Sequence, residues 1–139
     1  MTFGLEPTDH QELDRLLTYA LSFPAAVLDH PWDEDHNVCK VGGKMFAIAG
    51  ARQVRPGVTL RNQPEDVLAW RERYPTLIGS APHMGTKPWN LVYLDGGIPE
   101  DELDQMVEES YDSVVLTLPK KRRPLGWIEP AARGGSGQR

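Results

Sequence analysis

Four residues with binding chemistry lie close together in the turn-rich stretch 83–90, namely His83, Lys87, Trp89 and Asn90. A lysine ammonium can pair with a phosphate, and the face of an exposed tryptophan can stack on a nucleobase. The same residues also fit a structural interpretation, in which Trp89 anchors a strand, Asn90 bonds to the turn backbone and His83 caps a loop. The sequence therefore leaves both ligand contact and scaffold open for this stretch.

A second group of candidate contacts consists of Lys40, Lys44 and Arg61, which lie in the segment 36–64, where there is no Asp or Glu. Lys40 and Lys44 flank a Gly-Gly pair, and pairing of the two flanking strands brings their side chains near one another. Because two neighbouring cations repel, we expect a bound anion or a carboxylate from a nearby helix to join them. Solvated lysines on an ordinary hairpin are the alternative.

The distribution of charge is uneven. The net charge of −5 argues against a general nucleic-acid binder, but the acids gather mainly in 6–35 and 95–112. From residue 120 onward, six basic residues stand against one glutamate. This segregation predicts a positive face on an acidic protein, with Lys120 and Lys121 in an accessory basic run. A preference of acids for helices explains the same pattern without any binding role.

Other chemistries have little support in the sequence. The segment 29–36, DHPWDEDH, has the residue types of a metal site but lacks the spacing of convergent ligands, so a solvated acidic loop is expected. The single cysteine, Cys39, excludes an internal disulfide and fits a packed strand position better than a nucleophile. Ser110 lacks the surrounding motif of a hydrolase nucleophile. We therefore expect no catalytic residue, no metal and no cofactor.

Hydrophobic periodicity predicts the elements that position these residues. Helical spacing of apolar residues runs from Thr8 towards Pro24, again through 64–74, and from 99 to about 118. Strand patterns occupy 25–30, 37–41, 44–50, 57–61 and 89–94. Short turns between consecutive strands require antiparallel pairing, and helices with one apolar stripe must cover one face of the sheet. The prediction is a two-layer α+β fold with a mostly antiparallel sheet covered on one face by helices.

Length and composition fit one domain. The chain has 139 residues, 40% of them apolar, which suffices for a real core. We predict a single domain over 8–121 and a basic, Pro- and Gly-rich tail over 122–139 that is partly disordered, although Trp127 can fold back on the body. No segment reaches the roughly 18 apolar residues of a membrane span, and the N-terminus lacks the features of a signal peptide. A cytoplasmic protein is expected.

The stretch from about residue 10 to 121 resembles the MmcQ/YjbR family. The resemblance rests on KVGGKMFAI (40–48), on VTLR (58–61) leading into QPEDVLAWRERYP (63–75), and on the segment from HMGTKPWN to LPKK (83–121). It implies a compact α+β fold, often compared with frataxin-like or secretion-chaperone-like folds, and a DNA-binding label with no firmly attached reaction. This chain has HMGTKPWN where members have HMNK running directly into HWN. It also has Arg61 in place of the usual lysine, which preserves charge but changes hydrogen-bond geometry.

The leading hypothesis is a non-enzymatic binding protein for DNA or another polyanion. A protein–protein or small-molecule interaction module with no nucleic-acid role is the alternative. We expect no membrane partner, and a monomer or a weak homodimer formed through a free sheet edge. The candidate nucleic-acid or ligand contacts are Lys40, Lys44, Arg61, His83, Lys87, Trp89, Asn90, Lys120 and Lys121.

Overall fold

The computed structural model describes residues 7–50, 55–81, 84 and 88–132 of the chain. Its helices are α1 (Pro7–Leu21), α2 (Pro64–Arg73) and α3 (Glu100–Val115), followed by the short 3-10 helices η1 (Lys120–Arg122) and η2 (Pro130–Ala132). Its strands are β1 (Val27–Asp29), β2 (His36–Val41), β3 (Lys44–Gly50), β4 (Gly57–Arg61), β5 (Ile78–Ser80) and β6 (Trp89–Tyr93).

The strands form one sheet, in which every neighbouring pair is antiparallel and the order is β1-β2-β3-β4-β6-β5. Strand β6 lies between β4 and β5, so the chain runs from β4 through α2 to the edge strand β5 before it returns to fill the gap. Strand β5 has no counterpart among the strands predicted from the sequence. With three residues, one of them Gly79, this strand is too short to show a pattern of its own.

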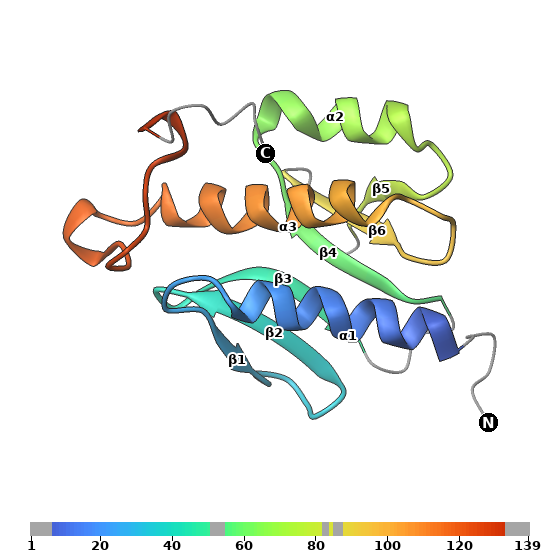
Figure 1. The fold of residues 1–139 in the computed structure, drawn as a ribbon, viewed down its shortest axis with the longest axis horizontal. Helices are drawn as coiled ribbons and strands as arrows, with labels where there is room; N and C mark the ends of the chain where they lie inside the picture. Colours follow the sequence, from blue (N-terminus) through green and yellow to red (C-terminus); the bar gives the residue numbers. More distant parts are fainter. Residues whose placement is uncertain (1–6, 51–54, 82–83, 85–87, 133–139) are drawn as a thin grey trace.

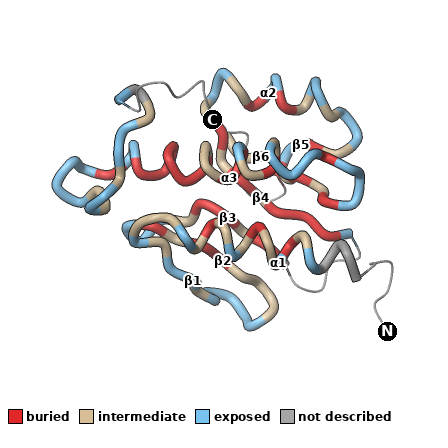
Figure 2. The backbone as a smooth tube through the Cα atoms, viewed as in Figure 1, coloured by how far each residue is buried: buried red, intermediate tan, exposed pale blue. Residues whose placement is uncertain are grey.

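The three helices lie together on one face of the sheet (Figure 1). Helix α3 packs on β3 and β4, while α1 packs on α3 and β2. The apolar stripes expected for α1 and α3 are buried, including Leu16 at 1% exposure and Leu103 at 2%. The sheet and the inner faces of the helices form the buried interior, and the outer loops are exposed (Figure 2). The predicted two-layer α+β fold is confirmed.

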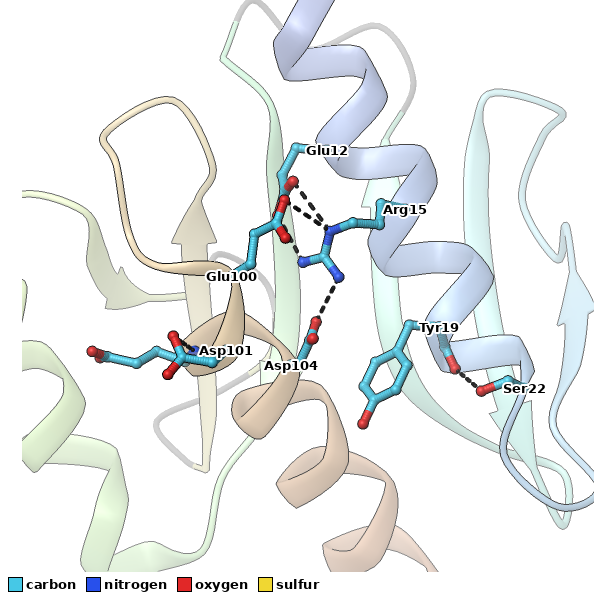
Figure 3. Close-up of polar contacts among 8 residues, drawn as sticks. Glu12, Arg15, Tyr19, Ser22, Glu100, Asp101 and Asp104 are labelled. Carbon is cyan, nitrogen blue, oxygen red and sulfur yellow. Dashed lines mark hydrogen bonds and ion pairs between the residues drawn. The ribbon is translucent and has the colours of Figure 1, made fainter. Parts of the chain in front are cut away.

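Arg15 joins the middle of α1 to the start of α3 (Figure 3). Its guanidinium donates to Asp104 Oδ1 at 2.8 Å and to Glu12 Oε2 at 2.8 Å, and it lies 3.5 Å from Glu100 Oε2. These bonds raise the pKa of Arg15 above its ordinary value, with Glu12 the largest cause. The Arg15 guanidinium therefore pairs with three carboxylates and holds α1 against α3.

The sheet splits between β3 and β4. These strands pair only through 47–48 and 59–60, and Phe46 is an extra residue because Cys39 faces Ala47 while Lys40 faces Met45. A residue inserted in this way bends the strand and interrupts the ladder of hydrogen bonds. At the split the hydroxyl of Ser110 on α3 donates to the Phe46 carbonyl and accepts from the Arg61 amide, the latter at 2.8 Å. A helix side chain therefore replaces the missing strand-to-strand bond.

The described part of the C-terminal tail, 122–132, contacts the domain. Trp127 packs partly buried against the core, and its indole Nε1 donates to Asp112 Oδ1 at 2.9 Å. The Arg123 guanidinium donates to the carbonyls of Leu118 and Leu116 beyond the end of α3. The fold-back of Trp127 is thus observed, whereas the domain limit at 121 and the partial disorder of the tail stay predictions. Within the described residues, no helix has the length and apolar character needed to cross a membrane.

The bridging role of Ser110 predicts the effect of its loss. Ser110→Ala leaves a buried carbonyl at Phe46 and a buried amide at Arg61 without partners, and such groups cost about 1–3 kcal/mol each to leave unsatisfied. We expect the free energy of unfolding, measured by urea titration followed by circular dichroism, to fall by about 2 kcal/mol or more.

Ser113→Ala is the matched control. Its hydroxyl is buried on the same helix but donates only to the Ser110 carbonyl at 3.0 Å, one turn back. Removing that local bond leaves no interstrand group without a partner, so a clearly smaller loss is expected. Equal losses in the two variants would contradict the bridging role.

Candidate ligand-binding pocket

A concave pocket of about 530 Å³ lies beside the turn that joins β2 and β3. Its described lining has three cations, two tryptophans and five smaller or apolar residues, and none of these residues is acidic. They are Lys40, Lys44, Arg61, Trp32, Trp89, Pro31, Gly43, Met45, Val114 and Thr117. A volume of this size falls within the range of small-molecule sites in proteins.

Antiparallel pairing explains why four residues from the sequence analysis meet here. Lys40 is the last residue but one of β2, Lys44 is the first of β3, and Arg61 is the last of β4. Trp89 opens β6 and is the cross-strand partner of Arg61. In an antiparallel sheet, the end of one strand lies beside the start of the next, so all four residues reach the same end of the sheet.

The pocket lies where strands β3 and β4 stop pairing and diverge. Met45 lines it from β3 and Arg61 lines it from β4, both just beyond the point where these strands stop pairing. Val114 and Thr117 line it from the end of α3 and the turn that follows. The pocket is therefore bounded by the diverging strands and by the helix whose Ser110 bridges them.

Lys40 carries its own counterion. Its ammonium lies 2.8 Å from Asp29 Oδ2 on β1, and hydrogen bonding by Lys40 holds the pKa of Asp29 below its ordinary value. The expected carboxylate partner therefore exists, but it comes from the edge strand and not from a helix. Lys40 and Lys44 are also not directly opposite one another, because Lys40 faces Met45 and Lys44 faces Val41.

Lys44 and Arg61 differ from Lys40 in their partners. The Lys44 ammonium donates to Thr117 Oγ1 at 3.1 Å, and the Arg61 guanidinium donates through Nη1 to the Ser113 carbonyl at 2.7 Å. Within the described part of the chain, neither cation lies within ion-pair distance of a carboxylate. Burial lowers the pKa of Arg61, although a guanidinium stays charged at physiological pH. A partly desolvated cation with only neutral partners favours an incoming anion.

The two tryptophans come from opposite sides of the cationic strands. Trp89 is half-buried on β6, and Trp32 is 56% exposed on the loop that joins β1 to β2. The Trp32 ring meets the His36 ring edge-on at a centroid distance of 6.0 Å, and His36 Nδ1 is 2.9 Å from Asp33 Oδ1. The loop that carries Trp32 is thus tied down by its own acidic residue.

Asn90 does not belong to the pocket. It is fully buried on β6, where its amide donates to Asn62 Oδ1 at 2.9 Å and its oxygen accepts from Arg71 Nε at 2.7 Å. The prediction that Asn90 contacts a ligand therefore has no support in its placement. Because successive strand residues point to opposite faces, Trp89 and Asn90 cannot both face one ligand from the middle of a strand. That alternation was available in the sequence.

The remaining sequence candidates lie elsewhere. His83 and Lys87 fall outside the described residues. Lys120 and Lys121 are exposed on η1 and do not line the pocket. They follow Leu118, whose side chain covers Gly42 of the β2–β3 turn so closely that a Cβ at Gly42 would lie 2.6 Å from Leu118 Cδ1. The basic run therefore begins near the rim of the pocket.

Sequence reasoning identified four of the ten lining residues, and the missed ones with polar or aromatic side chains are Trp32 and Thr117. Trp32 stands in the segment 29–36, which was interpreted as an acidic loop, and its signal was a large aromatic residue next to a proline outside any apolar stripe. In that loop Asp33 accepts from the amides of Asp35 and His36, so it shapes a turn. Among the described residues, no group of three His, Cys, Asp or Glu side chains could hold a metal ion.

A half-buried carboxylate adjoins the Asn90 network. Glu109 on α3 accepts from Asn62 Nδ2 at 3.2 Å, from Trp70 Nε1 at 3.3 Å and from Gln105 Nε2 at 3.3 Å. Burial raises the pKa of Glu109, and the charge of Asp66 adds to the effect. Arg71, which bonds to Asn90, also donates to the Trp89 carbonyl at 3.4 Å. The network therefore ties α2 and α3 to the strand that carries a pocket tryptophan.

The fold and the pocket together define a small α+β protein with a cationic, tryptophan-lined pocket at one end of an antiparallel sheet. The chain belongs to the YjbR family, whose family model matches residues 21–113.

Two curated relatives and one solved structure are similar to this chain in sequence, and a second solved structure shares its fold. The uncharacterized protein YjbR of Escherichia coli K12 is 30% identical over 113 residues, which span 81% of this chain and 95% of that protein. The uncharacterized protein YbdF of Escherichia coli O157:H7 is 31% identical, over 81% of this chain and 88% of that one. The crystal structure of Deinococcus radiodurans DR2400, a DUF419 domain, superposes with a TM-score of 0.74 at 28% identity, covering 80% of this chain and 84% of that chain. A Pseudomonas syringae protein shares the fold with a TM-score of 0.56 at 24% identity, covering 70% and 93%.

The raised pKa of Glu109 predicts a pH-dependent effect of Glu109→Gln. The pKa of Glu109 in the folded protein lies above the ordinary value of 4.5, so the folded protein holds this proton more tightly than the unfolded chain does. The ionised carboxylate therefore destabilises the fold progressively as pH rises from about 4.5 through the folded-state pKa. Glutamine has no such charge. The free energy of unfolding of Glu109→Gln, relative to wild type, should therefore increase between about pH 4 and pH 7 in urea titrations.

Glu72→Gln is the matched control, because Glu72 is exposed on α2. Its stability relative to wild type should change little over the same pH range. If the difference in the free energy of unfolding between Glu109→Gln and wild type stays constant with pH, the assignment of a raised pKa to Glu109 is contradicted.

Proposed function

We propose that this protein is a non-enzymatic binding protein for phosphate-bearing polyanions such as DNA, with the pocket as its centre. The observation that carries the proposal is the pair formed by Lys44 and Arg61, two cations in a concave site whose bonded partners are a hydroxyl and a carbonyl. Lys40 adds a third cation that Asp29 partly neutralises. The exposed run that includes Lys120 and Lys121 begins beside the pocket and supplies accessory contacts.

The state of the reactive side chains favours binding over catalysis. Cys39 is fully buried, and burial raises the pKa of its thiol to about 11, so the nucleophilic thiolate is scarce at neutral pH. The hydroxyl of Ser110 is buried between two backbone groups of the sheet. Both residues serve the scaffold.

A small-molecule binding module is the second candidate. The concave shape of the pocket and its two tryptophans favour it, since a surface that only tracks a nucleic-acid backbone needs no hollow of small-molecule size.

Salt dependence tests the polyanion proposal. Binding of a fluorescein-labelled DNA oligonucleotide, measured by anisotropy across a series of NaCl concentrations, should weaken with a log–log slope of about −0.9 per phosphate neutralised on a duplex, or about −0.7 on a single strand. Lys44→Met should weaken binding and reduce the magnitude of this slope by about one phosphate contact. Absence of binding at low salt, or binding that does not depend on salt, would contradict the proposal.

Lys121→Met removes the same charge outside the pocket lining. As an accessory contact it should cost less affinity than Lys44→Met. If the two variants lose equal affinity, the pocket is not the centre of binding.

The ion pair of Asp29 with Lys40 predicts a gain of affinity. Asp29→Asn removes the counterion, keeps an oxygen that can accept from the His30 amide, and frees Lys40 for a phosphate. We expect DNA binding in the same anisotropy assay to tighten severalfold, and the salt slope to steepen by about one phosphate.

Asp14→Asn is the control for net charge, because Asp14 is exposed on α1 and does not line the pocket. It should change affinity little. If Asp14→Asn tightens binding as much as Asp29→Asn, the gain reflects overall charge and not the release of Lys40.

A further inference from the structure

The charge of the pocket matches one terminal phosphate. Asp29 offsets Lys40, which leaves the charges of Lys44 and Arg61 without a carboxylate partner in the described part of the chain. A phosphate monoester carries about −1.5 to −2 charges near neutral pH, whereas each internal phosphate of a nucleic-acid strand carries one. Two unpaired cations in one pocket therefore suit a terminal phosphate better than an internal one.

The tryptophans add a second kind of recognition. In the order of the sheet, Trp32 follows β1 and Trp89 opens β6, so the strands that carry Lys40, Lys44 and Arg61 lie between them. Trp32 stays 56% exposed at the pocket although its loop is held in place. Large aromatic side chains beside cations suit a ligand that has both a planar ring and an anionic group.

The volume of the pocket limits how such a ligand can be presented. The pocket of about 530 Å³ is of small-molecule size, and the bases of a duplex are stacked and paired inside the helix. A base can reach Trp32 or Trp89 only from a free nucleotide or from an unpaired strand.

We infer that the pocket binds a nucleoside monophosphate group, with the phosphate on Lys44 and Arg61 and the base against Trp32. The group is either a free nucleotide or the phosphorylated end of a single strand. This inference rests on the proposed function, because it uses the same cations, and it specifies which part of a polyanion enters the pocket.

Calorimetric titration with four small probes tests the recognition of both parts. The probes are adenosine 5′-monophosphate, adenosine, ribose 5-phosphate and inorganic phosphate, at one low salt concentration. We expect adenosine 5′-monophosphate to bind about tenfold more tightly than ribose 5-phosphate, as stacking of one base allows. Adenosine should bind more weakly than its monophosphate, because it lacks the anionic group.

The variants change Trp32 and Lys44, because both side chains are exposed and their loss leaves the core intact. Trp32→Ala should abolish the advantage of adenosine 5′-monophosphate over ribose 5-phosphate and leave ribose 5-phosphate unchanged. Lys44→Met should weaken both phosphates and leave adenosine unchanged. Leu68→Ala, which removes a 62% exposed apolar side chain on α2 outside the pocket lining, is the control and should alter none of these affinities. Circular dichroism checks that each variant is folded.

A single-stranded oligonucleotide with and without a 5′-phosphate, and its duplex, separate the sources of the group. Tighter binding of the phosphorylated strand identifies the strand end as ligand, and equal binding of the two strands together with tight adenosine 5′-monophosphate binding identifies the free nucleotide. The inference is overturned if adenosine 5′-monophosphate binds no more tightly than ribose 5-phosphate, or if adenosine binds as tightly as its monophosphate. If the inference fails but DNA still binds in a salt-dependent way, the proposed function is retained. If DNA does not bind at all, the proposed function is rejected.

Discussion

The hydroxyl of Ser110 bridges two strands that have stopped pairing, and the arrangement of the pocket depends on this contact. It satisfies a carbonyl of β3 and an amide of β4 that would otherwise be buried without partners. It also fixes the rotation of α3, because Ser113, Val114 and Thr117 follow Ser110 at spacings that share one helix face. The Ser113 carbonyl therefore meets the Arg61 guanidinium, and Val114 and Thr117 reach the pocket.

Ion pairing elsewhere in the molecule concentrates the positive charge in the pocket. Arg55 is bonded to Asp95 at 2.9 Å, Arg73 to Glu102 at 2.8 Å, and Arg15 to the carboxylates at the start of α3. The segregation of charge along the sequence therefore does not translate into one broad basic face. Carboxylates far away in the chain neutralise Arg55 and Arg73 in the basic segment around 55–73, while Lys44 and Arg61 keep neutral partners.

Periodicity was enough to predict the helices, five of the strands and the packing of the helices on a single face of the sheet. These features depend on local spacing, as in the stripe that runs from Leu103 to Val115 on α3. The three-residue strand β5 could not be predicted from local spacing, because it is defined by its pairing with β6 in the folded chain. The residue types, three cations and a tryptophan, were enough to propose a shared site for Lys40, Lys44, Arg61 and Trp89.

What the sequence could not supply was the partner of each side chain in the site. Asp29 approaches Lys40 from the edge strand, and Thr117 approaches Lys44 across 73 positions of sequence. The burial of Asn90 follows from strand alternation, but its bonds to Asn62 and Arg71 join segments 28 and 19 positions apart. Such contacts depend on how α2 and α3 are seated on the sheet.

The insertion of β6 between β4 and β5 has a consequence for the order of assembly as the chain leaves the ribosome. Strands β1 to β4 can pair as soon as they are made, but β4 then remains an open edge. The backbone amides and carbonyls of residues 57–61 have no strand partner at this edge until residues 89–93 emerge. An open strand edge is prone to pair with other chains. The interval in which α2, β5 and the following loop are synthesised is therefore the time when the nascent protein is most vulnerable to aggregation.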